Sequence, residues 1–560
     1  MKIRVNKNIL KFLLIYVIVS LIFIFPFWKL GSVYTGWDMI FHLRRINELA
    51  LNIKSLNFHP YVYTYDFKSI GFPAGIFYPD ITLIPFALLR LLTGNFIITA
   101  LVGVGIYTFA TLVVVHWVVY KVTQNNLWAF FTAVIYAFST YRIVDIWTRF
   151  ALGEFIALTF IPLIIYGLYA IIVGNYNDWP FLAFGMALTM LTHVLSTYID
   201  ILFCLIIGML SIKTILNNNF IGRVFSLLKA VVTSFCASAI FILPFVEQEY
   251  TGIFSQPAPM KVSFYASPLF NVVKSMLNNN LFGNYNWGGD EAFTVGFIGL
   301  VVLVVGGIVF SHFSKLERII YFICIVLVIF PTTLLPWTLF NHVSLINVIQ
   351  FPFRELGIAS FLLSFLGGKE VIFVVNHFEK YGEYLTVIFV LLLIICPWYS
   401  SVTTLRATNQ LMNNCAIIES MKGNEYSTLN LDNYIPTRGL STLNDVSNDH
   451  LGKINNHNYY FKNYVSSPNL ITYRGLMIKK DDKVELPFYN IKNIQVIIAG
   501  KRQAVGTDNN GHVTFKPNRD TNRVEVKYIP SILDRLGELI TVITWGSLII
   551  VPLFKGKSRN

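Results

Sequence analysis

The sequence predicts an all-α polytopic membrane protein of about twelve transmembrane helices, with a small β-rich extracytoplasmic domain near its C-terminus. Of the 560 residues, 55% are hydrophobic and only 13% are charged, whereas a soluble domain carries about 25% charged residues. The apolar residues also come in long blocks, and the mean hydropathy is +0.59. Near the C-terminus these blocks give way to short runs that are typical of strands.

The apolar blocks account for the helical part, because a transmembrane helix needs about 20 predominantly apolar residues. We expect helices near 9–28, 96–120, 127–140, 155–173, 180–197, 199–216, 226–246, 292–311, 317–334, 353–368, 384–400 and 533–554. An even number of spans places both termini on one side of the membrane. Both ends are basic, with Arg4 and Lys7 near the start and Lys557 and Arg559 near the end. The positive-inside rule therefore predicts cytoplasmic termini.

The stretch 81–92 is apolar enough to be a short span, although it contains Pro85 and Arg90. As a span it would reverse the sidedness of everything after it. As a helix on the membrane surface, it leaves the following basic residues on the cytoplasmic side: Lys121, Lys213, Arg223, Lys229, Lys315, Arg318, Lys369 and Lys380. We therefore expect an interfacial helix, and we attribute the net charge of +13 to cytoplasmic loops rather than to nucleic-acid binding.

Three long segments then lie outside the cytoplasm, at 29–95, 247–291 and 401–532. The first two belong to a transmembrane domain at 1–400, and the third is a separate domain that is followed by a final helix and a basic tail at 533–560. Its strand signals are Ile494–Ile498, Val513–Phe515 and Val524–Tyr528, with Asn510-Gly511 as a hairpin turn. It contains no recognisable catalytic motif, and a role as a cap or spacer is the simplest interpretation.

Residues that can carry chemistry begin in the first external segment. Asp38 and His42 are four residues apart, a spacing that places a carboxylate and an imidazole on one helix face, with Arg45 one turn further on. An acid, a base and a cation at the mouth of an apolar protein point to chemistry on a lipid-borne polar substrate. The alternative is an interfacial helix with ordinary polar residues.

A second group follows between two predicted spans. Tyr141, Asp145 and Arg149 are spaced to line one helical face, and Arg142 and Glu154 add further charge. A charge at the bilayer centre costs at least about 2.5–3.5 kcal/mol. We therefore expect these side chains in a loop or helix end at the outer surface, with internal Asp–Arg and Arg–Glu pairs. A purely structural salt-bridge cluster is the alternative.

Further polar residues fall on the same predicted side. His193 ends a span, where it is either a ligand-facing residue or a hydrogen-bonded helix contact. Gln350 and Arg354 open another span, and Arg354 could clamp a phosphate because guanidinium forks match phosphate oxygens. It could equally pair with Glu355 or reach the interface. The aromatic stretch 71–80 could stack on sugars, although an ordinary interfacial aromatic belt is favoured.

At these residues the chain resembles a bacterial polytopic membrane family labelled "6-pyruvoyl-tetrahydropterin synthase-related" and, more distantly, YfhO-like proteins. The resemblance covers most of 1–400 and rests on Asp38-xxx-His42-Leu43-xx-Ile46, Tyr141-Arg142-xx-Asp145-xxx-Arg149-x-Ala151-x-Gly153-Glu154, His193 and Gln350-Phe351-Pro352-x-Arg354. That family is similar to GT-C glycosyltransferases, helical membrane enzymes with a catalytic acid in the first external loop.

The resemblance implies a GT-C-like fold in the bacterial cell membrane and an inverting glycosyltransferase with an extracytoplasmic active site. The donor would be a polyprenyl-phosphate-linked sugar, and the acceptor a cell-envelope polysaccharide or glycopolymer. Asp38 matches the first-loop acid, and Asp145 falls where many of these enzymes carry a second acid. Because His42 stands where a second first-loop acid is often found, the use of a divalent cation stays open.

We expect Asp38 to act as general base, with His42 orienting it or sharing the proton. Arg149, Arg354 and Arg45 would stabilise the leaving phosphate in a low-dielectric cleft. Asp145 and Glu154 would hold the arginines, or Asp145 would help to ligate a cation. The other substrate-binding candidates are Tyr141, Arg142, His193 and Gln350.

Two other classes of function remain open. A transporter or flippase for lipid-linked saccharides predicts inverted repeats and broken helices with charges at the midplane; no internal repeat is visible, and the charges cluster towards one surface. A non-catalytic scaffold for envelope assembly predicts that the outer ionisable residues tolerate substitution. The sugar, the acceptor, the oligomeric state and the role of 401–532 are not determined by the sequence.

Overall fold

The computed structural model describes residues 7–283, 291–377, 383–408, 410–422 and 431–555. Helices dominate the chain up to residue 422, and strands dominate from residue 451 until the final helix. The longer helices are α1 (Lys7–Leu30), α2 (Met39–Lys54), α4 (Ile84–Thr93), α5 (Phe96–Thr123), α6 (Asn126–Ala137), α9 (Ile161–Ile172), α10 (Pro180–Met190), α11 (Val194–Leu210), α13 (Phe220–Ala237), α14 (Ala239–Thr251), α15 (Leu269–Leu277), α16 (Gly296–Ile308), α17 (Lys315–Ile329), α19 (Leu356–His377), α20 (Glu383–Arg406), α21 (Asn414–Lys422) and α23 (Ile532–Lys555).

Within the described residues, five helices are long and apolar enough to cross a membrane: Leu10–Leu30, Phe96–Thr123, Phe220–Ala237, Pro352–His377 and Leu385–Arg406. A sixth is present if the pair Asn126–Ala137 and Thr140–Thr148, bent by 43°, counts as one span. Each predicted apolar block contains at least part of a helix. Several of these helices are too short to cross the apolar core of a bilayer. The expectation of about twelve spans is thus met only in part.

Breaks in the apolar blocks explain the shorter helices. The block at 155–173 is divided between α8 (Leu152–Ala157) and α9, and Pro162 lies in the first turn of α9, where proline fits best. The helix α4 has ten residues and is therefore about 15 Å long. That length is too short for a span and agrees with the expected surface helix at 81–92.

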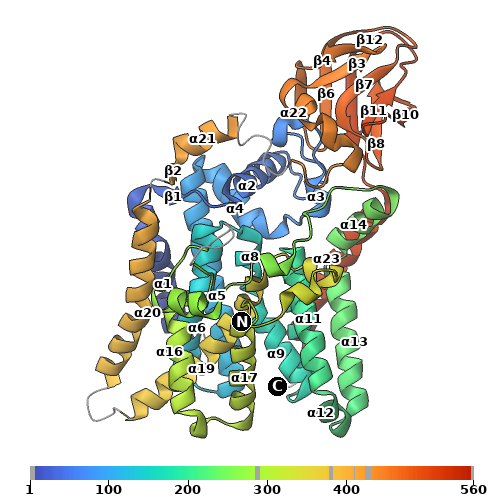
Figure 1. The fold of residues 1–560 in the computed structure, drawn as a ribbon. Helices are drawn as coiled ribbons and strands as arrows, with labels where there is room; N and C mark the ends of the chain where they lie inside the picture. Colours follow the sequence, from blue (N-terminus) through green and yellow to red (C-terminus); the bar gives the residue numbers. More distant parts are fainter. Residues whose placement is uncertain (1–6, 284–290, 378–382, 409, 423–430, 556–560) are drawn as a thin grey trace.

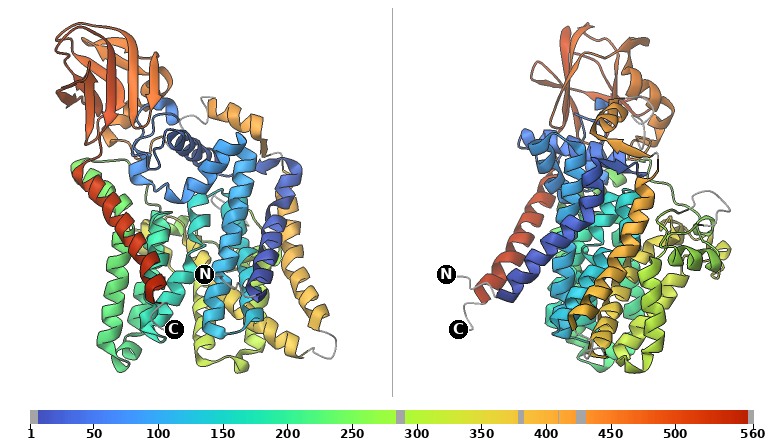
Figure 2. Two further views of the ribbon diagram at one scale, coloured as in Figure 1. Left: turned by 180° about the vertical axis from the view of Figure 1, so that it is seen from behind. Right: turned by 90° about the vertical axis from the view of Figure 1, so that its left-hand side faces the viewer.

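The β-rich region lies at one end of the helical bundle, next to α2 and α4 (Figure 1). Two further views show that α1 and α23 both extend from that end towards the opposite end of the bundle (Figure 2). The helix α2 runs across the end of the bundle rather than along it (Figure 1). Asp38 directly precedes α2 and therefore lies at the start of this crossing helix.

The β-rich region contains two five-stranded sheets, ordered β10-β11-β7-β3-β4 and β5-β6-β12-β8-β9. Their strands are β3 (Leu451–Ile454), β4 (His457–Tyr460), β5 (Tyr464–Ser467), β6 (Leu470–Ile478), β7 (Val484–Tyr489), β8 (Ile494–Ile498), β9 (Lys501–Gln503), β10 (Val505–Thr507), β11 (His512–Phe515) and β12 (Thr521–Tyr528). The three strands predicted from the sequence are confirmed as β8, β11 and β12. The Asn510-Gly511 turn joins β10 to β11, and Gly511 has a φ of +82°, which glycine adopts readily.

The chain leaves α20 only at Arg406, beyond the predicted boundary at 400, and first returns to the start of the molecule. The strand β2 (Leu411–Asn413) pairs antiparallel with β1 (Ser32–Tyr34). One residue further, the Thr35 N–H donates to the Gln410 carbonyl at 2.7 Å. These contacts fix the segment that leads from α1 to Asp38.

The β-rich region shares a hydrophobic core with the first external segment, because residues between Tyr61 and Phe77 belong to the same buried cluster as the strands. Polar contacts align the two parts: Asn469 Oδ1 accepts from the N–H groups of Tyr61 and Val62, each at 3.0 Å. The ring of Phe488 occupies the space that a Cβ on Gly71 would fill. The β-rich region is therefore seated on the segment that carries Asp38.

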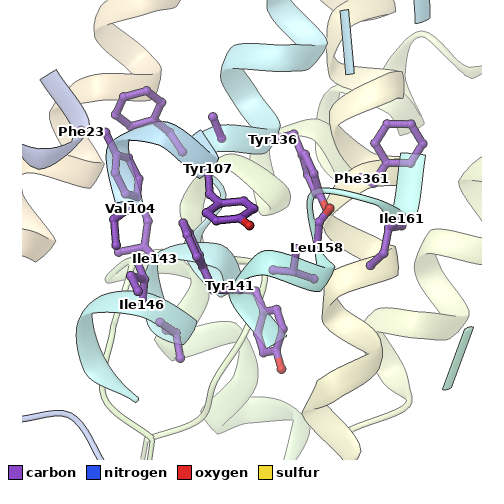
Figure 3. Packing of buried hydrophobic residues seen from close by; sticks show 14 of the residues in the cluster. Phe23, Val104, Tyr107, Tyr136, Tyr141, Ile143, Ile146, Leu158, Ile161 and Phe361 are labelled. Atoms are coloured by element: carbon purple, nitrogen blue, oxygen red, sulfur yellow. The ribbon is translucent and has the colours of Figure 1, made fainter. Parts of the chain in front are cut away.

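The main core lies within the helical bundle. Figure 3 shows Tyr107, Tyr136 and Tyr141 packed among aliphatic side chains and Phe361 of α19. The Tyr136 hydroxyl donates to the Leu158 carbonyl at 2.7 Å, and its ring meets Phe361 edge-on, with centroids 5.5 Å apart. This core holds the bent segment 126–148 against α19, which brings its polar residues towards the start of α19.

A buried carboxylate fixes the first external segment. Glu48 of α2 is fully buried, and its two oxygens accept the successive N–H groups of Thr64, Tyr65 and Asp66 at 3.0, 3.0 and 2.5 Å. Asn52 Nδ2 adds a fourth bond at 2.9 Å. All four groups around Glu48 are N–H donors. A carboxylate can accept on both of its oxygens, whereas an amide side chain can accept on only one.

We predict that Glu48→Gln destabilises this segment by about 1–3 kcal/mol, because the amide NH₂ would face backbone N–H donors and leave them unpaired. Hydrogen exchange followed by mass spectrometry should show faster exchange at residues 64–66. Glu419→Gln, at an exposed position on α21, is the matched control. Unchanged exchange in Glu48→Gln would contradict this role.

Candidate functional site

Asp38 reaches the second group of predicted residues through its backbone. Its N–H donates to the Arg149 carbonyl at 3.0 Å. Gly36 makes this approach possible, because a Cβ there would lie 2.5 Å from the Cβ of Phe150 and 2.9 Å from the Arg149 carbonyl carbon. Asp38 occupies the capping position of α2, yet its side chain makes no capping hydrogen bond. The carboxylate is thus not used for the role that aspartate usually has there.

Arg149 lies at the centre of a buried polar cluster. Its Nη1 donates to Asp145 Oδ1 at 2.6 Å and to Glu154 Oε2 at 3.0 Å. The Tyr141 hydroxyl donates to the other oxygen of Glu154. A π-helical turn, Val144–Thr148, separates Tyr141 from Arg149 and brings these side chains together. The expected Asp–Arg and Arg–Glu pairs are therefore present.

This group is buried within the protein rather than exposed, and its position at the outer face of the membrane stays a prediction. Tyr141, Arg142, Asp145, Arg149 and Glu154 are each at most 3% exposed. The internal ion pairs lower the free-energy cost of burial, because each carboxylate faces a guanidinium that offsets part of the cost of removing it from water. The spacing of these residues in the sequence predicts the ion pairs. It does not predict the π-helical turn that directs the paired side chains into the protein.

Arg354 joins the cluster from the start of α19. Its Nε lies 3.5 Å from Glu154 Oε2, and its Nη1 donates to Gln350 Oε1 at 3.1 Å. Gln350 in turn donates from Nε2 to the Ala258 carbonyl at 3.1 Å. The structure thus pairs Arg354 with Glu154 rather than with the neighbouring Glu355.

The charges of the buried cluster act on the Asp38 carboxyl group. Burial raises the pKa of Asp38 above its ordinary value, Arg149 and Arg354 oppose that rise, and Glu154 adds to it. Asp38 is half-buried. A carboxylate with a raised pKa that still faces two guanidinium groups is a stronger proton acceptor than an exposed aspartate.

The expected meeting of Asp38 with His42 is not found among the described residues. The Asp38 carbonyl accepts the His42 N–H at 3.0 Å in the first turn of α2, but no described hydrogen bond joins the two side chains. His42 Nδ1 instead lies 3.4 Å from Arg45 Nη1. A guanidinium can only donate, so Nδ1 is the acceptor and the proton is on Nε2. Burial, followed by the charge of Arg45, lowers the pKa of His42 well below its usual value.

Arg45 has fixed partners. Its Nη2 donates to Asp80 Oδ1 at 2.6 Å and to the Pro79 carbonyl at 2.7 Å, and its guanidinium lies 3.7 Å from the centre of the Tyr78 ring. Tyr63 also donates to Asp80. Arg45 therefore anchors the stretch around Tyr78, and its charge is already neutralised by Asp80.

His193 lies at the other edge of the site, as the capping residue of α11. Its Nδ1 accepts from the Ser196 N–H at 3.3 Å, which again leaves the proton on Nε2. Its ring lies 6.0 Å from the Tyr78 ring. Tyr78 thus stands between the two histidines, since its ring is also 5.9 Å from that of His42.

Arg142 is the one predicted residue whose described contacts lead away from the site. Its guanidinium lies 4.1 Å from the centre of the Phe155 ring, and its Nη1 donates to the Phe155 carbonyl at 3.3 Å. Sequence reasoning also missed Gly36 and Tyr78. The aromatic stretch 71–80 contains Tyr78, but its composition favoured an ordinary interfacial aromatic belt over a binding role.

Among the residues that the structure describes, no three His, Cys, Asp or Glu side chains gather as ligands for a metal ion. No protein-family model matches this chain, and no curated protein matches it either.

We predict that Arg149→Gln lowers the free energy of unfolding by about 3–5 kcal/mol, because it leaves the buried Asp145 without its cation and Glu154 with only the longer contact to Arg354. Thermal unfolding in detergent, followed by tryptophan fluorescence, measures the effect. Arg523→Gln breaks an exposed pair with Glu525 and should cost no more than about 1 kcal/mol. Equal effects of the two variants would show that the cluster does not hold the bundle together.

Proposed function

We propose that this protein is a GT-C-like membrane glycosyltransferase that moves a sugar from a polyprenyl-phosphate donor to a cell-envelope glycan. The observation that carries the proposal is the hydrogen bond from the Asp38 N–H to the Arg149 carbonyl at 3.0 Å, which joins the start of α2 to the buried cluster of Arg149, Glu154 and Arg354. An acid beside two guanidinium groups fits a reaction that removes a proton from an acceptor hydroxyl and releases a phosphate.

Asp38 is the general base in this proposal. As the acceptor oxygen attacks the anomeric carbon, its proton passes to the Asp38 carboxylate and the bond to the phosphate oxygen breaks. Direct displacement predicts inversion at the anomeric carbon. The raised pKa of Asp38 favours proton transfer, because a base works best when its pKa approaches the working pH. The His42 N–H donates to the Asp38 carbonyl at 3.0 Å, but its imidazole does not bond to the Asp38 carboxylate and takes a supporting place beside Tyr78.

Arg354 is the best-placed cation for the leaving phosphate. Arg45 is neutralised by Asp80, and Arg149 bridges Asp145 and Glu154. The Arg354 side chain, 8% exposed, lies 3.5 Å from Glu154 and bonds to the neutral Gln350. Fixed charge in a low-dielectric site stabilises a developing anion more than the same charge in water. Asp145 and Glu154 act through Arg149 and Arg354.

The proposal includes the finer topology. The start of α1 and the end of α23 lie away from the β-rich region (Figure 2). This arrangement agrees with about twelve spans, with cytoplasmic termini and with an extracytoplasmic site. Lys121 lies in the last turn of α5, Lys213 in the short helix Ile212–Asn217, and Lys315 at the start of α17. The proposal assigns these three positions to the cytoplasmic side, in line with the positive-inside rule.

We predict that Asp38→Asn lowers transfer by at least about a hundredfold, because general-base catalysis contributes about 10²–10⁴. The assay uses purified protein in lipid, radiolabelled polyprenyl-phosphate sugars and an extract of envelope polymer. Asp178→Asn is the matched control, since Asp178 pairs with Lys121 at 3.1 Å in the link between α9 and α10. Transfer by the wild type should also fall as the pH drops through the raised pKa of Asp38, because the protonated carboxyl cannot accept a proton.

Two outcomes would contradict the proposal. Equal transfer by the wild type and Asp38→Asn would keep the enzyme but discard its base. Absence of transfer by the wild type with every donor would favour a transporter or an envelope-assembly scaffold.

A further inference from the structure

The segment that leads into the β-rich region passes next to the site. Its residues 434–437 run beside 253–255: Ser255 N–H donates to the Ile435 carbonyl at 2.8 Å, and Thr437 N–H donates to the Ile253 carbonyl at 3.0 Å. The Tyr434 N–H donates to the Ser255 carbonyl at 2.5 Å. The segment 253–255, distant in sequence, thus holds the backbone of Tyr434 in place.

The Tyr434 side chain packs on the aromatic stretch of the first external segment. Its ring stacks on Phe77, with centroids 5.9 Å apart and planes inclined by 7°. It also lies 6.3 Å from the ring of Phe72. Because Phe77 directly precedes Tyr78, this stacking brings Tyr434 to the side of the site that Tyr78 lines.

The two phenol hydroxyls are available to a ligand. Within the described chain, neither the Tyr78 nor the Tyr434 hydroxyl has a hydrogen-bond partner. Neither oxygen is among the fully buried polar atoms without a partner, although the Tyr434 side chain is only 9% exposed and the Tyr78 hydroxyl packs beside Gly153. Most other buried tyrosines near the site use their hydroxyls, as Tyr63 does on Asp80 and Tyr141 does on Glu154.

Tyr434 is also within the electrostatic reach of the base. Burial raises the pKa of its phenol first, the Tyr78 phenol and Asp38 raise it further, and Arg45 lowers it. Its backbone has a φ of +65°, in the left-handed region, as Gln350 (+65°) and Phe150 (+52°) also do. Such strain persists where surrounding contacts impose it, and it is frequent at functional sites.

We propose that Tyr434 and Tyr78 bind hydroxyl groups of the acceptor saccharide, so that the C-terminal β-rich region supplies one wall of the acceptor subsite. This inference rests on the proposed glycosyltransferase function. A phenol can donate to and accept from a sugar hydroxyl, and an aromatic wall suits the apolar face of a sugar ring. Since Arg45 is already paired with Asp80, this wall has no free charge, and it fits a neutral, hydroxyl-rich acceptor.

The test uses the full-length protein in nanodiscs and fluorescently labelled neutral oligosaccharides built from hexose and N-acetylhexosamine units. Binding is measured at equilibrium without donor, and transfer is measured separately. Tyr434→Phe and Tyr78→Phe should each weaken binding of the preferred oligosaccharide about tenfold, as loss of one hydrogen bond predicts. The acceptor KM should rise in parallel while the donor KM stays unchanged.

Tyr473→Phe is the matched control, because Tyr473 has a buried hydroxyl without a partner inside the β-rich region. Asp38→Asn should keep binding and lose transfer. Unchanged binding in both tyrosine variants, or transfer without any oligosaccharide binding, would overturn the acceptor subsite alone. Tyrosine-dependent binding without transfer by the wild type would keep a saccharide site and overturn the glycosyltransferase. Absence of both activities would overturn both.

Discussion

The bridge that Arg149 makes between Asp145 and Glu154 is the interaction on which the rest of the site depends. One guanidinium nitrogen pairs with one oxygen of each buried carboxylate, and this bridge links the π-helical turn to the short helix α8. The carbonyl of the same residue receives the Asp38 N–H, and Glu154 receives Arg354. Three distant parts of the chain are thereby joined at one arginine. Because an unpaired buried charge costs several kcal/mol, this arrangement has few alternatives.

A second constraint acts from outside the bundle. Glu48 gathers the N–H groups of residues 64–66, and the β-rich region packs on the same external segment through a shared core. The β-rich region is consequently more than a spacer in our proposal. It packs against the external segment that carries Asp38. The chain that leads into it brings Tyr434 to the stretch around Tyr78. The fold thus couples a soluble region to a site at the end of the helical bundle.

The sequence predicted the parts of this structure that depend on local composition. Apolar blocks located the helices, and alternation located β8, β11 and β12. Strand β7 was missed because Glu485 and Pro487 interrupt its apolar pattern, although all its residues are buried. The residues of the cluster were found by spacing, but their burial depends on a helical break that pairing imposes. Asp38 and His42 are joined through the backbone in the first turn of α2, but the His42 ring meets Arg45 rather than the Asp38 carboxylate. Tyr434 could not be found, since only tertiary stacking brings it to Phe77.

The most direct test of the account is an electron cryomicroscopy structure with a non-hydrolysable polyprenyl-phosphonate sugar bound. The account predicts a phosphonate within hydrogen-bond distance of Arg354, with the anomeric carbon facing Asp38 and the far side of the sugar open towards Tyr78 and Tyr434. A phosphonate bound instead near Arg223, whose guanidinium donates to the Ile171 carbonyl at 2.7 Å, would place the lipid headgroup away from the proposed base. That result would contradict the assignment of Asp38 and Arg354 to sugar transfer.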